Sequence, residues 1–135
     1  MTEPFELKVR VYYEDTDAQG LVYYANYFRF MERARTEWLE ALGIDHLTLM
    51  HEHNRILVVT DAKAKFIVPA KLGDHLVVTA RLEKLGRATF DIEQCIYRNS
   101  TDDELLIRGG VTAAYIDAST MRPKRIPTDF FEGDL

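Results

Sequence analysis

The sequence predicts an α+β fold in which an antiparallel five-stranded sheet wraps around one long central helix. Two observations predict it. One long segment has apolar residues at helical spacing, and segments of alternating polarity lie on both sides of it, one before and four after. Short turns separate the four later segments, and short turns join antiparallel neighbours, so these strands should pair in one sheet.

The first strand is expected over residues 5–13, where apolar residues share one face: Phe5, Leu7, Val9, Val11 and Tyr13. A loop rich in turn-forming residues follows at residues 14–20. Apolar residues then recur every three or four positions and predict an amphipathic helix of about five turns, with Tyr27, Met31, Ala34, Trp38 and Leu42 on its stripe. This helix should end at Gly43, and a weaker pattern predicts a shorter helix over residues 44–53.

Four strands are predicted next, over residues 56–68, 76–82, 88–96 and 105–116, with turns at 69–74, 85–86 and 99–103. One face of the first of them is expected to carry Ile56, Val58, Thr60, Ala62, Ala64, Phe66 and Val68. The pair Gly109-Gly110 indicates a β-bulge in the last strand. Because one helix covers only one face of such a sheet, we expect a homo-oligomer, either a dimer or a homotetramer.

The composition is that of one globular domain spanning residues 1–135, with 47% hydrophobic residues and a formal net charge of -5. The acidic balance and the lack of a Lys/Arg cluster exclude nucleic acid as the expected partner. The longest apolar run, residues 21–25, is too short for a membrane span, and the acidic start does not fit an export signal. A single cysteine, Cys95, excludes an internal disulfide, so we expect a cytoplasmic protein.

The densest polar cluster lies in the loop before the long helix and comprises Glu14, Asp15, Thr16 and Asp17. Backbone N–H groups near Tyr24, at the start of the helix, should be unpaired and could stabilise a developing negative charge. A carboxylate beside such donors predicts an acyl-transfer site, with Asp17 as nucleophile or general base. The alternative is that Asp15 and Asp17 are only turn and capping residues.

Two motifs resemble those of a known enzyme family: VRVYYEDTDAQGLVYYANY at residues 9–27 and ERARTE at residues 32–37. They are similar to the hotdog-fold acyl-CoA thioesterases of the 4-hydroxybenzoyl-CoA thioesterase family, in particular to its branch associated with the Tol-Pal system. The resemblance implies a hotdog fold and hydrolysis of an acyl-CoA thioester. It also implies that Asp17 is the catalytic aspartate, that Tyr13 belongs to the site, and that the backbone N–H near Tyr24 polarises the thioester carbonyl. The sequence departs from that branch at Tyr24, where histidine is usual, and at Gln19, where glycine is common.

Substrate-binding residues are expected in two places. Family geometry implies that Val59 and Thr60 of a partner chain complete the site. Coenzyme A carries phosphates, so basic residues should surround the mouth of the site, with Arg87 as the first candidate and Lys84 as the second. Both could also be ordinary solvated charges of a hairpin. An acyl carrier protein is the alternative carrier of the acyl group.

No cofactor or metal is expected. A thioester is an activated bond, so one carboxylate and oriented hydrogen-bond donors suffice to hydrolyse it. The spacing of His46, His51 and His53 matches no strong zinc motif. Two other functions stay open: a hotdog hydratase or dehydratase, which needs an Asp/His pair, and a non-catalytic acyl-thioester binding module, in which Asp17 is only a cap.

Overall fold

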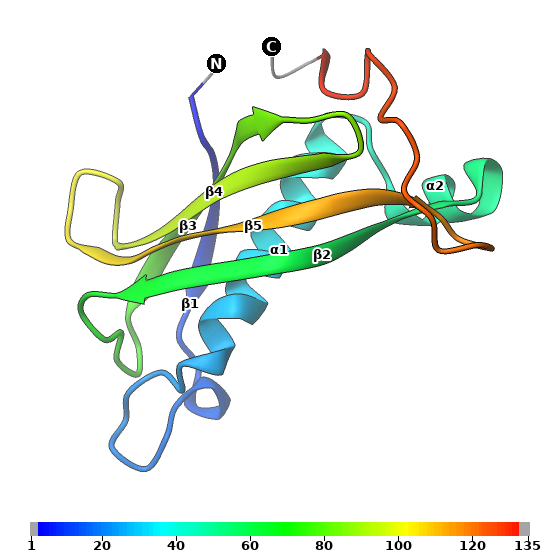
Figure 1. The fold of residues 1–135 in the computed structure, drawn as a ribbon. Helices are drawn as coiled ribbons and strands as arrows, with labels where there is room; N and C mark the ends of the chain where they lie inside the picture. Colours follow the sequence, from blue (N-terminus) through cyan, green and yellow to red (C-terminus); the bar gives the residue numbers. More distant parts are fainter. Residues whose placement is uncertain (1–2, 133–135) are drawn as a thin grey trace.

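Five strands and two α-helices make up the fold of the computed structural model, which describes residues 3–132 (Figure 1). In chain order the elements are β1 (Phe5–Arg10), the 3-10 helix η1 (Tyr13–Asp15), α1 (Ala25–Ala41), α2 (His46–His53), β2 (Arg55–Phe66), β3 (His75–Leu85), β4 (Thr89–Arg98) and β5 (Leu105–Asp117).

The five strands form one sheet in the order β1-β3-β4-β5-β2, and every neighbouring pair is antiparallel. Helix α1 crosses one face of this sheet (Figure 1). Apolar side chains of α1 and of the facing side of the sheet fill the space between them in two clusters. The predicted α+β fold, with a five-stranded antiparallel sheet around one long helix, is confirmed. Strands β1 and β2 are its two edges.

Helix α1 buries the stripe that its spacing predicts, including Tyr27, Met31, Ala34 and Trp38. Its end is confirmed as well, because Gly43 follows the C-cap with a φ of 85° and donates its N–H to the carbonyl of Glu40. Fully burying one such large side chain contributes about 1.5–3 kcal/mol, so this stripe fixes α1 on the sheet.

The second helix starts two residues later than expected. The carboxylate of Asp45 accepts hydrogen bonds from the amide of Thr48 at 3.0 Å and from its hydroxyl at 2.9 Å. Asp45 is therefore the N-cap, and α2 begins at His46. At the other end, Asn54 takes a left-handed conformation with a φ of 53° and stops the helix before β2.

The first strand is shorter than its alternation predicts and ends at Arg10. Tyr13 lies instead in η1 and is 82% exposed. The carboxylate of Asp15 accepts the amide of Tyr12 at 2.8 Å, and the amide of Asp15 donates to the carbonyl of Tyr12 at 3.0 Å. These local bonds turn the chain out of the sheet. The strand therefore ends at Arg10, although the alternation of polar and apolar residues continues to Tyr13.

The predicted apolar face of β2 is correct after Thr60 but wrong for the residues before it. Val59 pairs with Ala113, but the next paired residue, Asp61, faces Thr112, so Thr60 forms a bulge. A bulge shifts the alternation by one residue. Leu57 and Val59 face α1 before the bulge, together with Ala62, Ala64 and Phe66 after it.

The expected bulge at Gly109-Gly110 is also wrong, because these residues pair in register with Ala64 and Lys63. The glycines meet a different need. A Cβ atom on Gly109 would lie 2.6 Å from the carbonyl oxygen of Lys63, and one on Gly110 would lie 2.7 Å from that of Ile92. Only residues without a side chain allow β5 to approach its neighbours so closely.

The segment after β5 closes the end of the core beside the C-terminal end of α1. Phe131 is buried and stacks on Trp38 with ring centroids 5.8 Å apart, and it meets Phe90 edge-on at 4.8 Å. Ile126 is buried in the same cluster. Within residues 3–132, neither helix has the length and apolarity to traverse a bilayer.

Candidate functional site

The loop before α1 folds into a tight turn around Asp17, which we call the Asp17 turn (residues 16–22). An antiparallel bridge joins Thr16 to Val22 at its base. Inside it, the amide of Asp17 donates to the carbonyl of Leu21 at 2.8 Å, and the amide of Gly20 donates to the carbonyl of Asp17 at 3.0 Å. Gly20 has a φ of 78°, a conformation that glycine adopts without strain. The turn therefore has a defined backbone.

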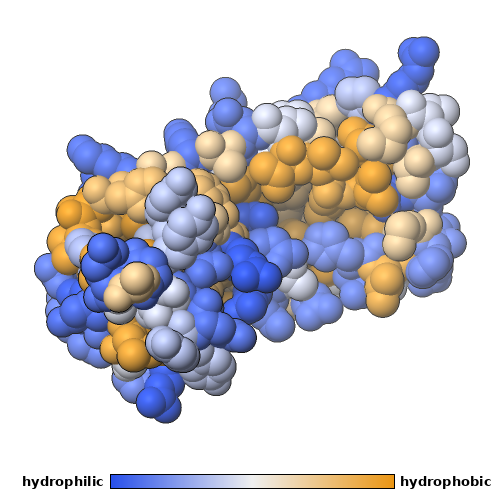
Figure 2. Space-filling model, turned by 90° about the horizontal axis from the view of Figure 1, so that it is seen from below, coloured by the Kyte–Doolittle hydropathy of each residue, from blue (hydrophilic) through white to orange (hydrophobic). Residues whose placement is uncertain are grey.

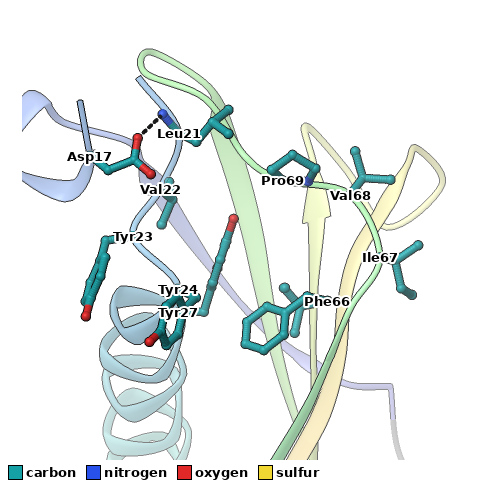
Figure 3. Close-up of a pocket in the computed structure, with 11 residues that line it drawn as sticks. Asp17, Leu21, Val22, Tyr23, Tyr24, Tyr27, Phe66, Ile67, Val68 and Pro69 are labelled. Atoms are coloured by element: carbon teal, nitrogen blue, oxygen red, sulfur yellow. Dashed lines mark hydrogen bonds between the residues drawn. The ribbon is translucent and has the colours of Figure 1, made fainter. Parts of the chain in front are cut away.

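The carboxylate of Asp17 is held by this turn through one oxygen. Its Oδ1 accepts the amide of Gln19 at 2.9 Å. The same oxygen accepts the amide of Leu21 at 3.2 Å (Figure 3). Its Oδ2 has no hydrogen-bond partner within the part of the chain that the structure describes. Asp17 is therefore a turn residue, as one interpretation of the sequence expects, and it keeps one carboxylate oxygen for another partner. Its catalytic role stays a prediction.

Asp17 lies at the edge of an apolar cavity of about 400 Å³. Figure 3 shows the cavity between the start of α1 and the residues around the end of β2. Of the described residues that line it, only Asp17 is charged, and the others are aromatic or aliphatic: Leu21, Val22, Tyr23, Tyr24, Tyr27, Phe66, Ile67, Val68, Pro69 and Ile107. Such a cavity suits an apolar ligand with one reactive polar group.

The N-terminus of α1 supplies hydrogen-bond donors at this cavity. Tyr24 is the N-cap residue and lines the cavity, and no acidic residue occupies the first turn of α1. The amide of Tyr23 is taken by the carbonyl of Asp15 at 3.0 Å, whereas the amide of Tyr24 has no backbone acceptor among residues 3–132. Together with the helix dipole, this donor favours negative charge on a bound group.

Tyr27 is a cavity residue that sequence reasoning placed only in the apolar stripe of the helix. It is 2% exposed, and its ring lies 5.7 Å from that of Phe66 across the cavity. Its hydroxyl accepts the amide of Ala70 at 3.0 Å. Burial raises the pKa of Tyr27 above its ordinary value, so the hydroxyl keeps its proton at neutral pH. The only sequence signal for this role of Tyr27 is that a tyrosine, with its polar hydroxyl, lies within an otherwise apolar stripe.

The structure does not bring Tyr13 to the cavity of its own chain. Tyr13 points from η1 into solvent, and its carbonyl accepts the hydroxyl of Thr16 at 2.8 Å. Its membership of the site stays a prediction.

Val59 and Thr60 also lie away from the Asp17 cavity, on the edge strand β2. Val59 lines a second cavity of about 230 Å³ between α1 and β2. The hydroxyl of Thr60 donates to the carbonyl of Thr112 at 3.4 Å. Both residues are exposed, so a second chain can reach them.

Arg87 and Lys84 are exposed near the β3–β4 hairpin, and neither lines the cavity of Asp17. The carbonyl of Arg87 accepts the amide of Ile126 at 2.8 Å, which ties the hairpin to the C-terminal segment. Their side chains are free to meet a solvent-exposed ligand, and their role in binding stays a prediction.

Arg35, which lines the second cavity, forms a polar pair with the buried Gln94 that sequence reasoning missed. Arg35 of α1 donates to Oε1 of Gln94 at 2.9 Å, and Nε2 of Gln94 donates to the carbonyl of Met31 at 2.8 Å. Gln94 is fully buried, and burial lowers the pKa of Arg35. Gln94 alternates in sequence with Phe90 and Ile92, which favours the apolar face of β4, and only the fold shows that its amide anchors α1 to the sheet.

The histidines do not form a metal site in the described part of the chain. His51 and His53 are exposed on α2, and His46 lines the second cavity. Over residues 3–132, no three His, Cys, Asp or Glu side chains lie where they could share a metal ion.

Comparisons with known proteins identify the family of the chain. Residues 11–133 match the family described as the thioesterase-like superfamily. The chain is 40% identical over 125 residues to the acyl-CoA thioesterase YbgC of Haemophilus influenzae, covering 93% of this chain and 90% of that one.

Solved structures give the same result. The fold matches a probable thioesterase from Bartonella henselae with a TM-score of 0.85 and 31% identity, over 93% of this chain and 100% of that chain. It also matches the 4-hydroxybenzoyl-CoA thioesterase of Pseudomonas sp. strain CBS-3 with a TM-score of 0.87 over 97% and 99% of the two chains. That identity is 20%, so the second match shows the hotdog fold alone.

Proposed function

The chain belongs to the thioesterase-like superfamily, and on this premise we propose that it is an acyl-CoA thioesterase, which hydrolyses an acyl-CoA thioester to a free acid and coenzyme A. The observation that carries the proposal is the position of Asp17. Its free Oδ2 lies at the edge of an apolar cavity, next to the N-terminus of α1. The cavity suits an acyl group, and the carboxylate suits attack on a carbonyl at its entrance.

The helix start and Asp17 have complementary tasks. The carbonyl oxygen of the thioester gains negative charge as the carbon becomes tetrahedral, and the N–H of Tyr24 is the donor that stabilises this charge. One oriented donor of this kind contributes about 10²–10³-fold, and a positioned base about 10²–10⁴-fold. Together they make a substantial catalyst for an activated bond.

Asp17 can act in two ways. As a nucleophile, its carboxylate oxygen bonds to the carbonyl carbon, the C–S bond breaks, and the coenzyme A thiolate leaves with the electron pair and takes up a proton. Water then hydrolyses the mixed anhydride and regenerates the carboxylate. As a general base, Asp17 takes a proton from water, and the hydroxide adds to the carbon before the same C–S bond breaks.

Release of free thiol tests the proposal. The wild type and Asp17→Asn are compared on a panel of short, long and aromatic acyl-CoAs. The wild type should release thiol from at least one of them, and Asp17→Asn should be strongly impaired on the same substrate. A wild type that is inactive on the whole panel would contradict the proposed function.

Single-turnover hydrolysis in ¹⁸O-labelled water separates the two roles of Asp17. Attack by the carboxylate forms the mixed anhydride, and labelled water that adds to its Asp17 acyl carbon leaves label in the carboxyl group of Asp17, which general-base catalysis cannot do. General-base catalysis leaves the label only in the released acid. Mass spectrometry of the peptide that contains Asp17 reads the difference.

A second copy of the chain is part of the proposal, as a dimer or tetramer in which Val59 and Thr60 of the partner complete the site. The apolar surface around β2 supports it. Val59, Phe66 and Ile67 are 44%, 50% and 44% exposed on or just after this edge strand. Figure 2 shows hydrophobic side chains gathered along a hollowed face of the molecule, beside a row of hydrophilic ones. An exposed apolar edge strand of this kind is a template for pairing with another chain.

The proposal also includes the carrier of the acyl group and the cellular compartment of the protein. Arg87 and Lys84, both exposed, are proposed to meet the phosphates of coenzyme A. An acyl carrier protein presents the same thioester bond and is kept as the alternative carrier. The buried free thiol of Cys95 is compatible with a reducing compartment and supports a cytoplasmic location.

The two other functions make different demands. A hydratase or dehydratase would need a histidine beside Asp17, and no histidine is among the described residues that line its cavity. A non-catalytic binding module would not depend on the charge of Asp17. In that case Asp17→Asn would bind acyl-CoA as the wild type does, and neither protein would release thiol.

A further inference from the structure

The Asp17 turn packs against the segment between β2 and β3. We call residues 69–74 of this segment the docking segment. It supplies Pro69 to the wall of the cavity. Two backbone hydrogen bonds join the two segments, from the Val22 amide to the Ala70 carbonyl at 2.9 Å and from the Leu72 amide to the Gly20 carbonyl at 3.0 Å. Together they form an antiparallel bridge between Leu21 and Lys71. The Asp17 turn therefore rests on the docking segment on both sides of Leu21.

Arg98, the last residue of β4, fastens the docking segment at both of its ends. Its Nη2 donates to the carbonyl of Pro69 at 3.0 Å, and its Nε donates to Oδ2 of Asp74 at 3.2 Å. The same oxygen of Asp74 accepts the amide of Lys71 at 2.9 Å. The Arg98 side chain is only 18% exposed, and it also pairs with Glu104. The planar guanidinium thus fixes two points of the segment at once.

These contacts form a continuous path from Arg98 to Asp17, although Arg98 does not line the cavity. Arg98 fixes the docking segment, the docking segment pairs with Leu21, and the amide of Leu21 holds Oδ1 of Asp17 at 3.2 Å. A catalytic group must be held within about 0.5 Å of its productive position. A loosened docking segment would therefore move the carboxylate.

We infer that Arg98 is a positioning residue for Asp17, acting through the docking segment. This inference rests on the proposed function and adds to it a residue on the far side of the turn. The inference predicts that loss of the guanidinium affects the chemical step more than substrate binding, because Pro69 is the only described lining residue of the cavity that the docking segment supplies.

The variant Arg98→Met tests the inference, since methionine keeps an unbranched side chain and removes both donors. We expect kcat for acyl-CoA hydrolysis to fall about 10- to 100-fold, with KM changing less than about threefold. The matched control is Arg81→Met, which breaks the 2.7 Å ion pair with Glu93 between β3 and β4 and should leave kcat within about twofold. An unchanged kcat in Arg98→Met, or an equal loss in Arg81→Met, would overturn the inference.

A double variant shows whether the effect passes through Asp17. Residues that act as one unit have non-additive effects. Adding Arg98→Met to Asp17→Asn should therefore lower the residual rate by less than about twofold. A loss as large as in the wild-type background would mean that Arg98 acts independently of Asp17, against the inference.

Amide hydrogen exchange needs no substrate and so separates this inference from the proposed function. In Arg98→Met we expect the amides of Leu21 and Val22 to exchange at least about tenfold faster, while amides at the centre of β5 keep their rates. Unchanged exchange at Leu21 and Val22, or a uniform rise over the whole sheet, contradicts the inference at any level of activity. Should the wild type release no thiol while exchange changes as expected, the proposed function fails and the structural link from Arg98 to Leu21 stands.

The variant Arg98→Lys keeps the test decisive if the methionine variant does not fold. Lysine retains the charge but is a point donor, which cannot reproduce the fork that reaches Pro69 and Asp74 together. We expect kcat and the exchange of Leu21 to change in the same direction as in Arg98→Met, by a smaller factor. Wild-type values of both quantities would refute the positioning role.

Discussion

The amide of Ala70 donates a 3.0 Å hydrogen bond to the hydroxyl of Tyr27, which links the docking segment directly to helix α1. Ala70 is fully buried and Tyr27 is 2% exposed, so water does not replace this bond. The ring of Tyr27 forms one wall of the Asp17 cavity, while its hydroxyl holds the segment that carries the Asp17 turn. One side chain thus shapes the cavity and supports its polar end.

Removing this hydroxyl should destabilise the protein. In Tyr27→Phe the amide of Ala70 loses its acceptor in a buried position, and an unsatisfied buried amide costs about 1–3 kcal/mol. Urea unfolding followed by circular dichroism measures the free energy of unfolding. The control is Tyr12→Phe, at a position that is 59% exposed, where the change should stay within about 0.5 kcal/mol. Equal stabilities of the two variants would mean that the Tyr27 bond adds nothing.

The substitution Asp17→Asn should affect activity far more than folding. Asparagine keeps an oxygen at the position of Oδ1, so it can still accept the amides of Gln19 and Leu21 and preserve the turn. The lost carboxylate should lower kcat by about 10²–10⁴-fold, with a melting temperature near that of the wild type. Asp102→Asn, in the exposed β4–β5 turn, serves as the control in the same thiol-release assay. Wild-type turnover by Asp17→Asn would exclude a catalytic role for this carboxylate.

The backbone of β5 tolerates no side chain at Gly109. In Gly109→Ala the new Cβ atom would lie 2.6 Å from the carbonyl oxygen of Lys63 and 3.3 Å from Cε of Met31. The backbone contact has to give way, so we expect a loss of about 1–3 kcal/mol in the free energy of unfolding. Thermal and urea unfolding both measure it. A variant as stable as the wild type would show that β2 and β5 can separate at this point without cost.

Asp117 should make stability depend on pH in the acid range. Hydrogen bonds from the amides of Thr120 and Ser119, with the nearby charge of Arg55, hold the pKa of Asp117 below its ordinary value of 3.8. A lowered pKa in the folded state stabilises the protein above the unfolded-state pKa. This contribution is lost as the pH falls through the lower folded-state value. Asp117→Asn should therefore flatten the dependence of the melting temperature on pH below about pH 4.

Nuclear magnetic resonance gives a direct check on Asp117. A titration of its side-chain carboxyl carbon should show a midpoint below 3.8. A midpoint at or above that value would contradict the hydrogen-bonding explanation, whatever the melting temperatures show.

Much of the site was accessible from the sequence because its components are local. The position of Asp17 in a polar turn just before an apolar helix follows from seven consecutive residues, 14–20, and from the spacing of the stripe that begins at Tyr27. Periodicity also indicated all five strands and both helices. Local interactions, such as the turn bonds of Asp17, depend on residues close in the chain, so a single sequence contains the information needed to predict them.

The tertiary structure decided what depends on distant segments. The bulge at Thr60 exchanges which residues of β2 face α1, and it is visible only in the pairing of β2 with β5. Arg98 and the Asp17 turn are far apart in sequence, and the docking segment joins them only once β2, β3 and β4 are assembled. The alternation of polar and apolar residues indicates which residues can share a face. Close packing and strand register determine which face is buried and which distant side chains support the turn that holds the Asp17 carboxylate.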